Sequence, residues 1–110
     1  MFYAKAAALS GASSVLLGAF GAHALARYTT DAKALATWQT ASAYHLIHSG
    51  VLLHAAAQRN TAACRLLAGG MLVFSGSLYV LTLSGHKWLG AVTPIGGLLL
   101  TAGWVALALY

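Results

Sequence analysis

The spacing of the charged residues constrains this chain more than any other feature of its sequence. Its six basic residues stand singly or in loose pairs, at Lys5, Arg27, Lys33, Arg59, Arg65 and Lys87. They leave four uncharged stretches of 21 to 25 residues, at 6–26, 34–58, 66–86 and 88–110. About 20 predominantly apolar residues in a helix cross the ~30 Å hydrocarbon core of a bilayer. The pattern therefore predicts a single transmembrane domain, residues 1–110, with four spans.

The composition excludes several other classes of protein. Hydrophobic residues make up 60% of the chain and charged residues only 6%, whereas soluble domains carry roughly a quarter of their residues as Asp, Glu, Lys and Arg. The formal net charge of +5 could indicate nucleic-acid binding, but that function needs basic residues gathered on one solvated face. Here they mark the ends of apolar segments. We therefore expect the lipid bilayer as a partner and no nucleic acid.

Short polar connections between the spans predict an all-α, up-down-up-down four-helix bundle. The fourth span contains the only proline, Pro94. It removes one backbone hydrogen bond and would kink a helix that begins near Lys87. Alternatively, Thr93 caps a shorter helix that runs from Pro94 to Tyr110. In both cases we expect helix four to be kinked or broken near Pro94.

Small residues recur at helical spacing in three of the four spans. Such residues let helices approach closely in a bilayer, where no hydrophobic effect drives one helix against another. Four of them lie three or four residues apart in the first span and share one face. The helix-packing positions that we expect are Gly11, Ser14, Gly18, Gly21, Gly70, Gly76, Ser77 and Gly97.

A group of polar side chains falls in the half of the bilayer that faces the first and third loops. This candidate polar half-core consists of His23, His45, His48, Tyr79, Thr82 and His86. Ionisable residues inside a membrane usually face the bundle interior and often mark a function. A neutral histidine also serves as interhelical glue through a single hydrogen bond. Because His45 and His48 lie only about 60° apart on a helix, both could point into one interface.

Two functions could use these histidines, and they differ in what else they need. Proton relays use Asp, Glu or His inside the membrane. The only acidic residue, Asp31, lies in a loop, so an oligomeric proton or small-solute channel or transporter would have to rely on histidine. A haem or metal carrier is a weaker alternative, because the chain has neither a C-x-x-C-H attachment site nor an acidic co-ligand. We assign no catalytic residue, no metal ligand and no cofactor.

Several motifs together resemble one known family. They are the segments 18–23 (GAFGAH), 38–41 (WQTA), 44–48 (YHLIH), 74–79 (FSGSLY), 93–97 (TPIGG) and 103–104 (GW). In this order, and over almost the whole chain, they resemble the domain of unknown function 423 family, small bacterial inner-membrane proteins related to animal transmembrane protein 256. The resemblance implies four transmembrane helices and supplies no catalytic residue. Some members of the family are connected with membrane integrity and stress.

These observations predict a non-enzymatic inner-membrane protein. Its expected role is to support membrane integrity or to act as a small accessory subunit, in a homo-oligomer or in a larger membrane complex. Three basic residues fall on each side of the membrane, so the positive-inside rule does not choose an orientation. The amino terminus and Asp31 favour termini in the cytoplasm.

Overall fold

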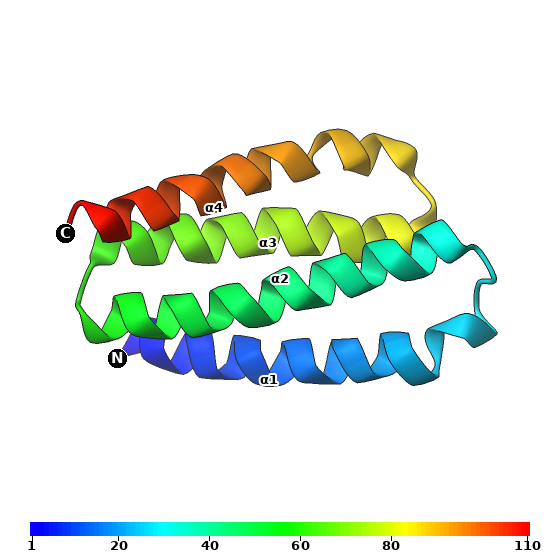
Figure 1. Cartoon of the computed structure of the whole chain (residues 1–110), viewed down its shortest axis with the longest axis horizontal. Coiled ribbons are helices and arrows are strands. Elements are labelled where there is room, and N and C mark those ends of the chain that lie inside the picture. Colours follow the sequence, from blue (N-terminus) through cyan, green and yellow to red (C-terminus); the bar gives the residue numbers. More distant parts are fainter.

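The computed structural model describes residues 1–110 and consists of helices joined by short connections (Figure 1). The elements, in chain order, are α1 (Phe2–His23), the 3₁₀ helix η1 (Leu25–Arg27), α2 (Ala32–Ala57), α3 (Thr61–Ser84), the 3₁₀ helix η2 (Lys87–Ala91) and α4 (Thr93–Ala108). Consecutive long helices run in opposite directions. The predicted all-α, up-down-up-down four-helix fold is confirmed.

Local sequence accounts for where the helices begin and end. Asp31 caps α2, because its carboxylate accepts a backbone N–H of the first turn at 3.0 Å. Asn60 caps α3 in the same way, and its side-chain amide donates to the carbonyl of Ala106 on α4 at 3.2 Å. The α3 helix ends at Gly85, whose φ of 74° lies in the left-handed region that glycine adopts without strain. Through its hydrogen bond to Ala106, Asn60 also fixes one end of α4 against α3.

The fourth span is broken just before Pro94, as the sequence predicted. The short helix η2 stops at Ala91, and α4 begins at Thr93 with Pro94 in its first turn. A proline costs little there, because the N–H that it lacks would have no acceptor within the helix. The hydroxyl of Thr93 donates to the carbonyl of Leu89 at 3.3 Å and so connects the two pieces.

The four helices form an open row and not a closed square. The α1 helix packs on α2, α2 on α3 and α3 on α4, while α1 and α4 lie at opposite edges (Figure 1). The molecule measures 44 × 26 × 18 Å. Only 20 of 110 residues are buried, and large apolar side chains such as Leu9, Leu72 and Leu98 are exposed. An exposed surface of this kind suits a bilayer, in which apolar side chains face lipid.

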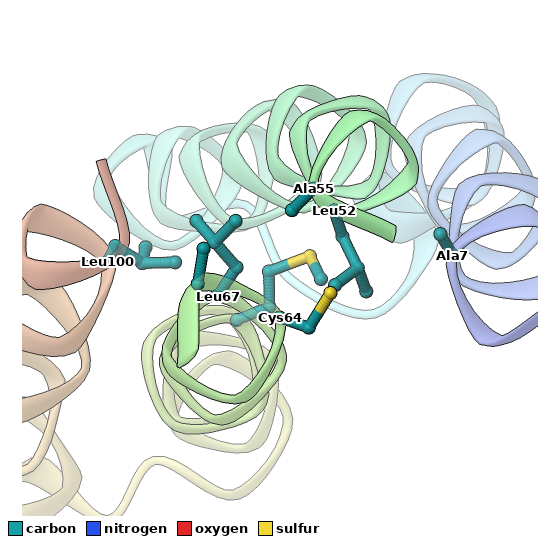
Figure 2. Packing of buried hydrophobic residues seen from close by; sticks show 8 residues of the cluster. Ala7, Leu52, Ala55, Cys64, Leu67 and Leu100 are labelled. Atoms are coloured by element: carbon teal, nitrogen blue, oxygen red, sulfur yellow. The ribbon is translucent and has the colours of Figure 1, made fainter. Parts of the chain in front are cut away.

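The apolar core lies in the half of the molecule that contains the termini and the α2–α3 connection. Its centre is formed by Leu52 and Ala55 of α2 with Cys64 and Leu67 of α3 (Figure 2). Ala7 of α1 and Leu100 of α4 close it from the two sides.

Three segments are long and apolar enough to cross a membrane: α1, α3 and the segment Lys87–Ala108. The α2 helix is not among them, although its 26 residues extend about 39 Å at 1.5 Å per residue. Its polar residues lower its hydropathy, and two of them, His48 and Ser49, are buried. The least apolar helix is thus an inner member of the row, between α1 and α3.

Candidate functional site

One imidazole joins three helices at the centre of the molecule. His45 lies on α2, and its Nδ1 is 3.0 Å from the hydroxyl oxygen of Tyr79 on α3. Its Nε2 is 2.9 Å from Oγ of Ser10 on α1. The Ser10 Oγ is in turn 2.7 Å from Oγ of Ser49, one turn along α2 from His45. We call these four residues the His45 chain.

Each hydroxyl group and the neutral imidazole has one hydrogen to donate, so the donors and acceptors along the His45 chain can be assigned in one order. Ser49 donates its only hydroxyl hydrogen to the carbonyl of His45 at 2.7 Å, so it accepts from Ser10. Ser10 has then used its own hydrogen and accepts from Nε2–H of His45. A neutral imidazole has a single N–H, so Nδ1 accepts the hydroxyl hydrogen of Tyr79. Met71 Sδ, a weaker acceptor, lies 3.7 Å from Ser49 and 3.9 Å from Ser10.

His48 forms a second, separate connection. Its side chain is buried, and Nδ1 is 2.8 Å from the carbonyl of Tyr44, one turn earlier on α2. A carbonyl only accepts, so Nδ1 carries the hydrogen and Nε2 is an acceptor. Trp104 of α4 donates its indole N–H to this Nε2 at 3.1 Å. His48 contacts α4 while His45 contacts α1 and α3, so the two rings enter different interfaces although their spacing would allow them to share one.

Three members of the predicted half-core do not join either connection. Thr82 donates to the carbonyl of Leu78 on its own helix at 2.9 Å. His23 lies in the last turn of α1, His86 lies beyond the end of α3, and both are exposed. Side chains at helix ends reach the membrane surface. The structure therefore brings His45 and Tyr79 together, places His48 in a separate contact, and leaves His23, Thr82 and His86 outside.

Other interhelical contacts come from residues outside the predicted half-core: Ser10, Ser49, Trp38, Ser75 and Trp104. Ser75 donates to the carbonyl of Ala41 at 2.8 Å, and Trp38 donates to the carbonyl of Leu17 at 2.7 Å. Ser49 follows His45 by four residues, a spacing that could have identified it. Nothing in the local sequence marks the indole of Trp104 as a partner of His48.

The small residues of α1 face α2, but the space between the two helices differs along α1. A Cβ added to Gly11 or Gly18 would lie 3.8 Å or 3.7 Å from a serine of α2, which is ordinary van der Waals contact. A Cβ on Gly21 would collide with the indole of Trp38. Ser14 is buried, and its hydroxyl donates to the Gly11 carbonyl at 2.7 Å.

The small residues of α3 and α4 let the two backbones touch. A Cβ on Gly70 would lie 2.8 Å from the backbone nitrogen of Leu100, and a Cβ on Gly96 would collide with the backbone of Phe74. Ser77 and Thr93 hydroxyl oxygens lie 2.6 Å apart across the same interface. Gly97 and Gly103 also face α3. A Cβ on Gly97 would lie 3.8 Å from the Phe74 ring, and a Cβ on Gly103 would lie 2.7 Å from the Leu67 side chain.

Gly76 has a different role from the one expected. A Cβ placed there would meet no atom within 4 Å, so Gly76 does not mediate helix packing. It lines a cavity of about 310 Å³ whose wall also includes Ser10, His45 and Tyr79. The cavity walls come from α1, α2 and α3, and most of the lining residues are hydrophobic.

The arrangement of these side chains limits the chemistry that they can perform. Both ring nitrogens of His45 contact neighbouring helices. In His48, Nδ1 is bonded within α2 and Nε2 contacts α4. No group of three His, Cys, Asp or Glu side chains comes together in a geometry that could hold a metal ion. The site is a set of interhelical connections beside a largely apolar cavity.

Four antiparallel helices with apolar outer surfaces and polar side chains turned inward define a helical membrane protein. The chain belongs to the family described as protein of unknown function DUF423, whose model matches residues 17–97. No solved structure matches the chain.

Related proteins from distant organisms carry the same description, UPF0382 membrane protein. The relative from Schizosaccharomyces pombe is 40% identical over 110 residues, covering 92% of this chain and 93% of its own. That from Haemophilus influenzae is 40% identical over 112 residues, covering 96% and 90%. The Bacillus subtilis relative, YwdK, is 37% identical over 106 residues, covering 89% and 85%. Their likeness extends along nearly the whole bundle and supports its membrane location.

Proposed function

We propose that this protein is a non-enzymatic membrane component that supports membrane integrity or acts as a small accessory subunit of a membrane complex. The observation that carries this proposal is the use of both ring nitrogens of His45 and of His48 in contacts with protein groups. A general base or a metal ligand needs a free nitrogen lone pair. The lone pair of each ring already accepts a hydrogen bond from Tyr79 or Trp104.

The open row of helices supports a role in assembly. The edge helices, α1 and α4, each have only one long neighbour, so much of their surface is available to lipid or to other membrane helices. A second copy of this chain or a larger complex could occupy such a surface. The hydrogen bonds between the helices would keep the row rigid when a partner binds to this surface.

The proposal is tested by measuring both the thermal stability and the activity of a variant that lacks the His45 side chain. His45→Ala should lower the thermal unfolding temperature in mild detergent, because it breaks the contacts with α1 and α3. His54→Ala is the matched control, since His54 is an exposed residue of the same helix. Purification of tagged wild-type protein from native membranes, followed by mass spectrometry, should recover it with other membrane proteins or as an oligomer. Isolation of a lone monomer that turns over a substrate, with His45→Ala inactive but folded, would contradict the proposal.

A second candidate, an oligomeric proton channel, is favoured by one observation. The His45 chain is a run of consecutive hydrogen bonds from Tyr79 to Ser49, and such runs can pass protons. Proteoliposomes loaded with a pH-sensitive dye discriminate between the two functions. The structural role predicts no proton flux above that of empty vesicles. A flux that Tyr79→Phe abolishes and His54→Ala preserves would establish the channel.

We further propose that the protein resides in the inner, or plasma, membrane with both termini in the cytoplasm. The even number of helices supports termini on one shared side. A reporter enzyme that is active only in the cytoplasm, fused after Tyr110, should be active. An otherwise identical fusion within the α1–α2 connection should be inactive, and the reverse pattern would overturn this orientation.

A further inference from the structure

A cavity of about 610 Å³, lined mostly by polar residues, lies at the end of the molecule that contains the α1–α2 and α3–α4 connections. It is bounded on one side by the first residues of α2 and on the other by the end of α3 and by η2. Figure 1 shows these segments together at the same end of the row. The lining residues that bear on its chemistry are Asp31, Lys33, Ala34, Thr37, Thr82 and Lys87.

Neighbouring aromatic residues indicate the depth of this cavity in a membrane. Tyr28 is 75% exposed and directly precedes the lining residue Thr29. Trp88 is 65% exposed and directly follows Lys87. Exposed Tyr and Trp gather where the hydrocarbon core meets the head groups. We therefore expect the cavity to lie at the level of the phospholipid head groups.

One part of the lining supplies positive charge and hydrogen-bond donors. Lys33 and Lys87 reach the cavity from two separate segments of the chain. The backbone N–H of Ala34, in the first turn of α2, has no acceptor in the chain. Helix N-termini favour negative charge, and together with ammonium groups they favour phosphate.

Another part of the lining supplies acceptors and a negative charge. Asp31 is the only acidic residue of the protein, and one of its carboxylate oxygens remains after the other has capped α2. Thr37 and Thr82 donate their hydroxyl hydrogens to carbonyls of their own helices, both at 2.9 Å. Their oxygens can therefore only accept further hydrogen bonds. A group with several N–H donors and a positive charge fits this part of the lining.

We propose that this cavity binds the head group of a phospholipid that carries both a phosphate and a primary ammonium, as in ethanolamine lipids. The phosphate lies between Lys33, Lys87 and the N–H of Ala34, and the ammonium lies at Asp31. A choline head group has no N–H to donate, and a glycerol head group has no positive charge for Asp31. The site does not depend on the role of the histidines.

Native mass spectrometry of the detergent-purified, delipidated protein tests the assignment. It is titrated with phosphatidylethanolamine, phosphatidylcholine and phosphatidylglycerol of identical acyl chains, and with soluble phosphoethanolamine. We expect the ethanolamine lipid to reach several-fold higher occupancy than the other two lipids. Equal occupancy by all three lipids overturns the proposal. If soluble phosphoethanolamine binds as tightly as its lipid, the site recognises a free phosphoamine, and the assignment to a lipid is overturned.

Three variants locate the site. Lys33→Gln and Lys87→Gln should each weaken binding of the ethanolamine lipid about fivefold, the contribution of one lysine beside a lipid phosphate. Asp31→Asn should abolish the preference over phosphatidylglycerol, and it keeps the fold because Asn also caps helices. The control is Arg65→Gln, which removes a positive charge from the opposite end of the molecule and should leave the preference unchanged. Equal weakening by Arg65→Gln would show a nonspecific charge effect and would overturn the site.

Discussion

The two outer helix pairs are held together in different ways. Between α3 and α4 the backbones touch, because Gly70 and Gly96 place no side chain between them. Between α1 and α2, Gly11 and Gly18 leave ordinary van der Waals distances. There the contact is made by polar side chains, above all by Trp38, which donates to the carbonyl of Leu17.

This difference shows two solutions to one problem of membrane folding. Lipid solvates apolar helices as well as other helices do, so burial of apolar surface does not drive association. The α3–α4 pair gains dispersion energy from close backbone contact. The α1–α2 pair gains hydrogen bonds, which also connect it to α3 through His45. We therefore expect substitutions of equal size to have unequal effects in the two pairs.

The largest effect is expected for Gly96→Ala. The added methyl group would collide with the backbone of Phe74, which no change of rotamer can relieve. Overpacking costs typically 1–3 kcal/mol, and against backbone we expect about 3 kcal/mol of unfolding free energy in mixed-micelle denaturation. Gly76→Ala is the control, with no atom within 4 Å of its Cβ. Equal destabilisation by the two variants would show that close α3–α4 contact is not important.

A smaller loss is expected for Gly21→Ala in the α1–α2 pair. Its methyl group would displace the indole of Trp38, which is a side chain and can shift, so we expect about 2 kcal/mol. Combining Gly21→Ala with Trp38→Phe should recover part of the loss, because the smaller ring leaves room. Strictly additive effects in this double-mutant cycle would contradict the contact.

Loss of a single interhelical hydrogen bond should cost less again. Tyr79→Phe and Trp104→Phe remove the donors to His45 and His48 while conserving most of the apolar surface. Interhelical hydrogen bonds in membranes average about 0.6 kcal/mol, and an unpaired buried nitrogen adds to this cost, so we expect about 1 kcal/mol each. Tyr28→Phe, at an exposed position, controls for loss of a hydroxyl group. Unfolding temperatures equal to that of Tyr28→Phe would show that these two hydrogen bonds do not stabilise the helix bundle.

The smallest effect is expected for Gly18→Ala. Its methyl group would lie 3.7 Å from Oγ of Ser42, a normal contact distance. Replacing a helical glycine also restricts the unfolded chain, which offsets small losses, so the change should stay within about 0.5 kcal/mol. If Gly18→Ala lowered the unfolding free energy as much as Gly21→Ala, α1 and α2 would be packed as closely at Gly18 as at Gly21.

The fold was predictable from the sequence because charge spacing reports where each helix meets water. The break before Pro94 was predictable as well, since proline acts on its own helix. The site was predictable only in part. His45 and His48 were selected by their chemistry, but their partners depend on which helix faces each side of α2. Sequence spacing alone allowed them to share one interface, whereas they lie in two.

By itself, then, the sequence determined a four-helix membrane protein and the antiparallel order of its helices. Only the tertiary structure decided that the helices form an open row, that His45 connects α1 and α3, and that Trp104 reaches His48. The physical reason is that exclusion of charge from lipid acts along each helix separately. The bilayer does not distinguish one apolar face of a helix from another, so rotation and pairing are set by close contacts and hydrogen bonds between helices.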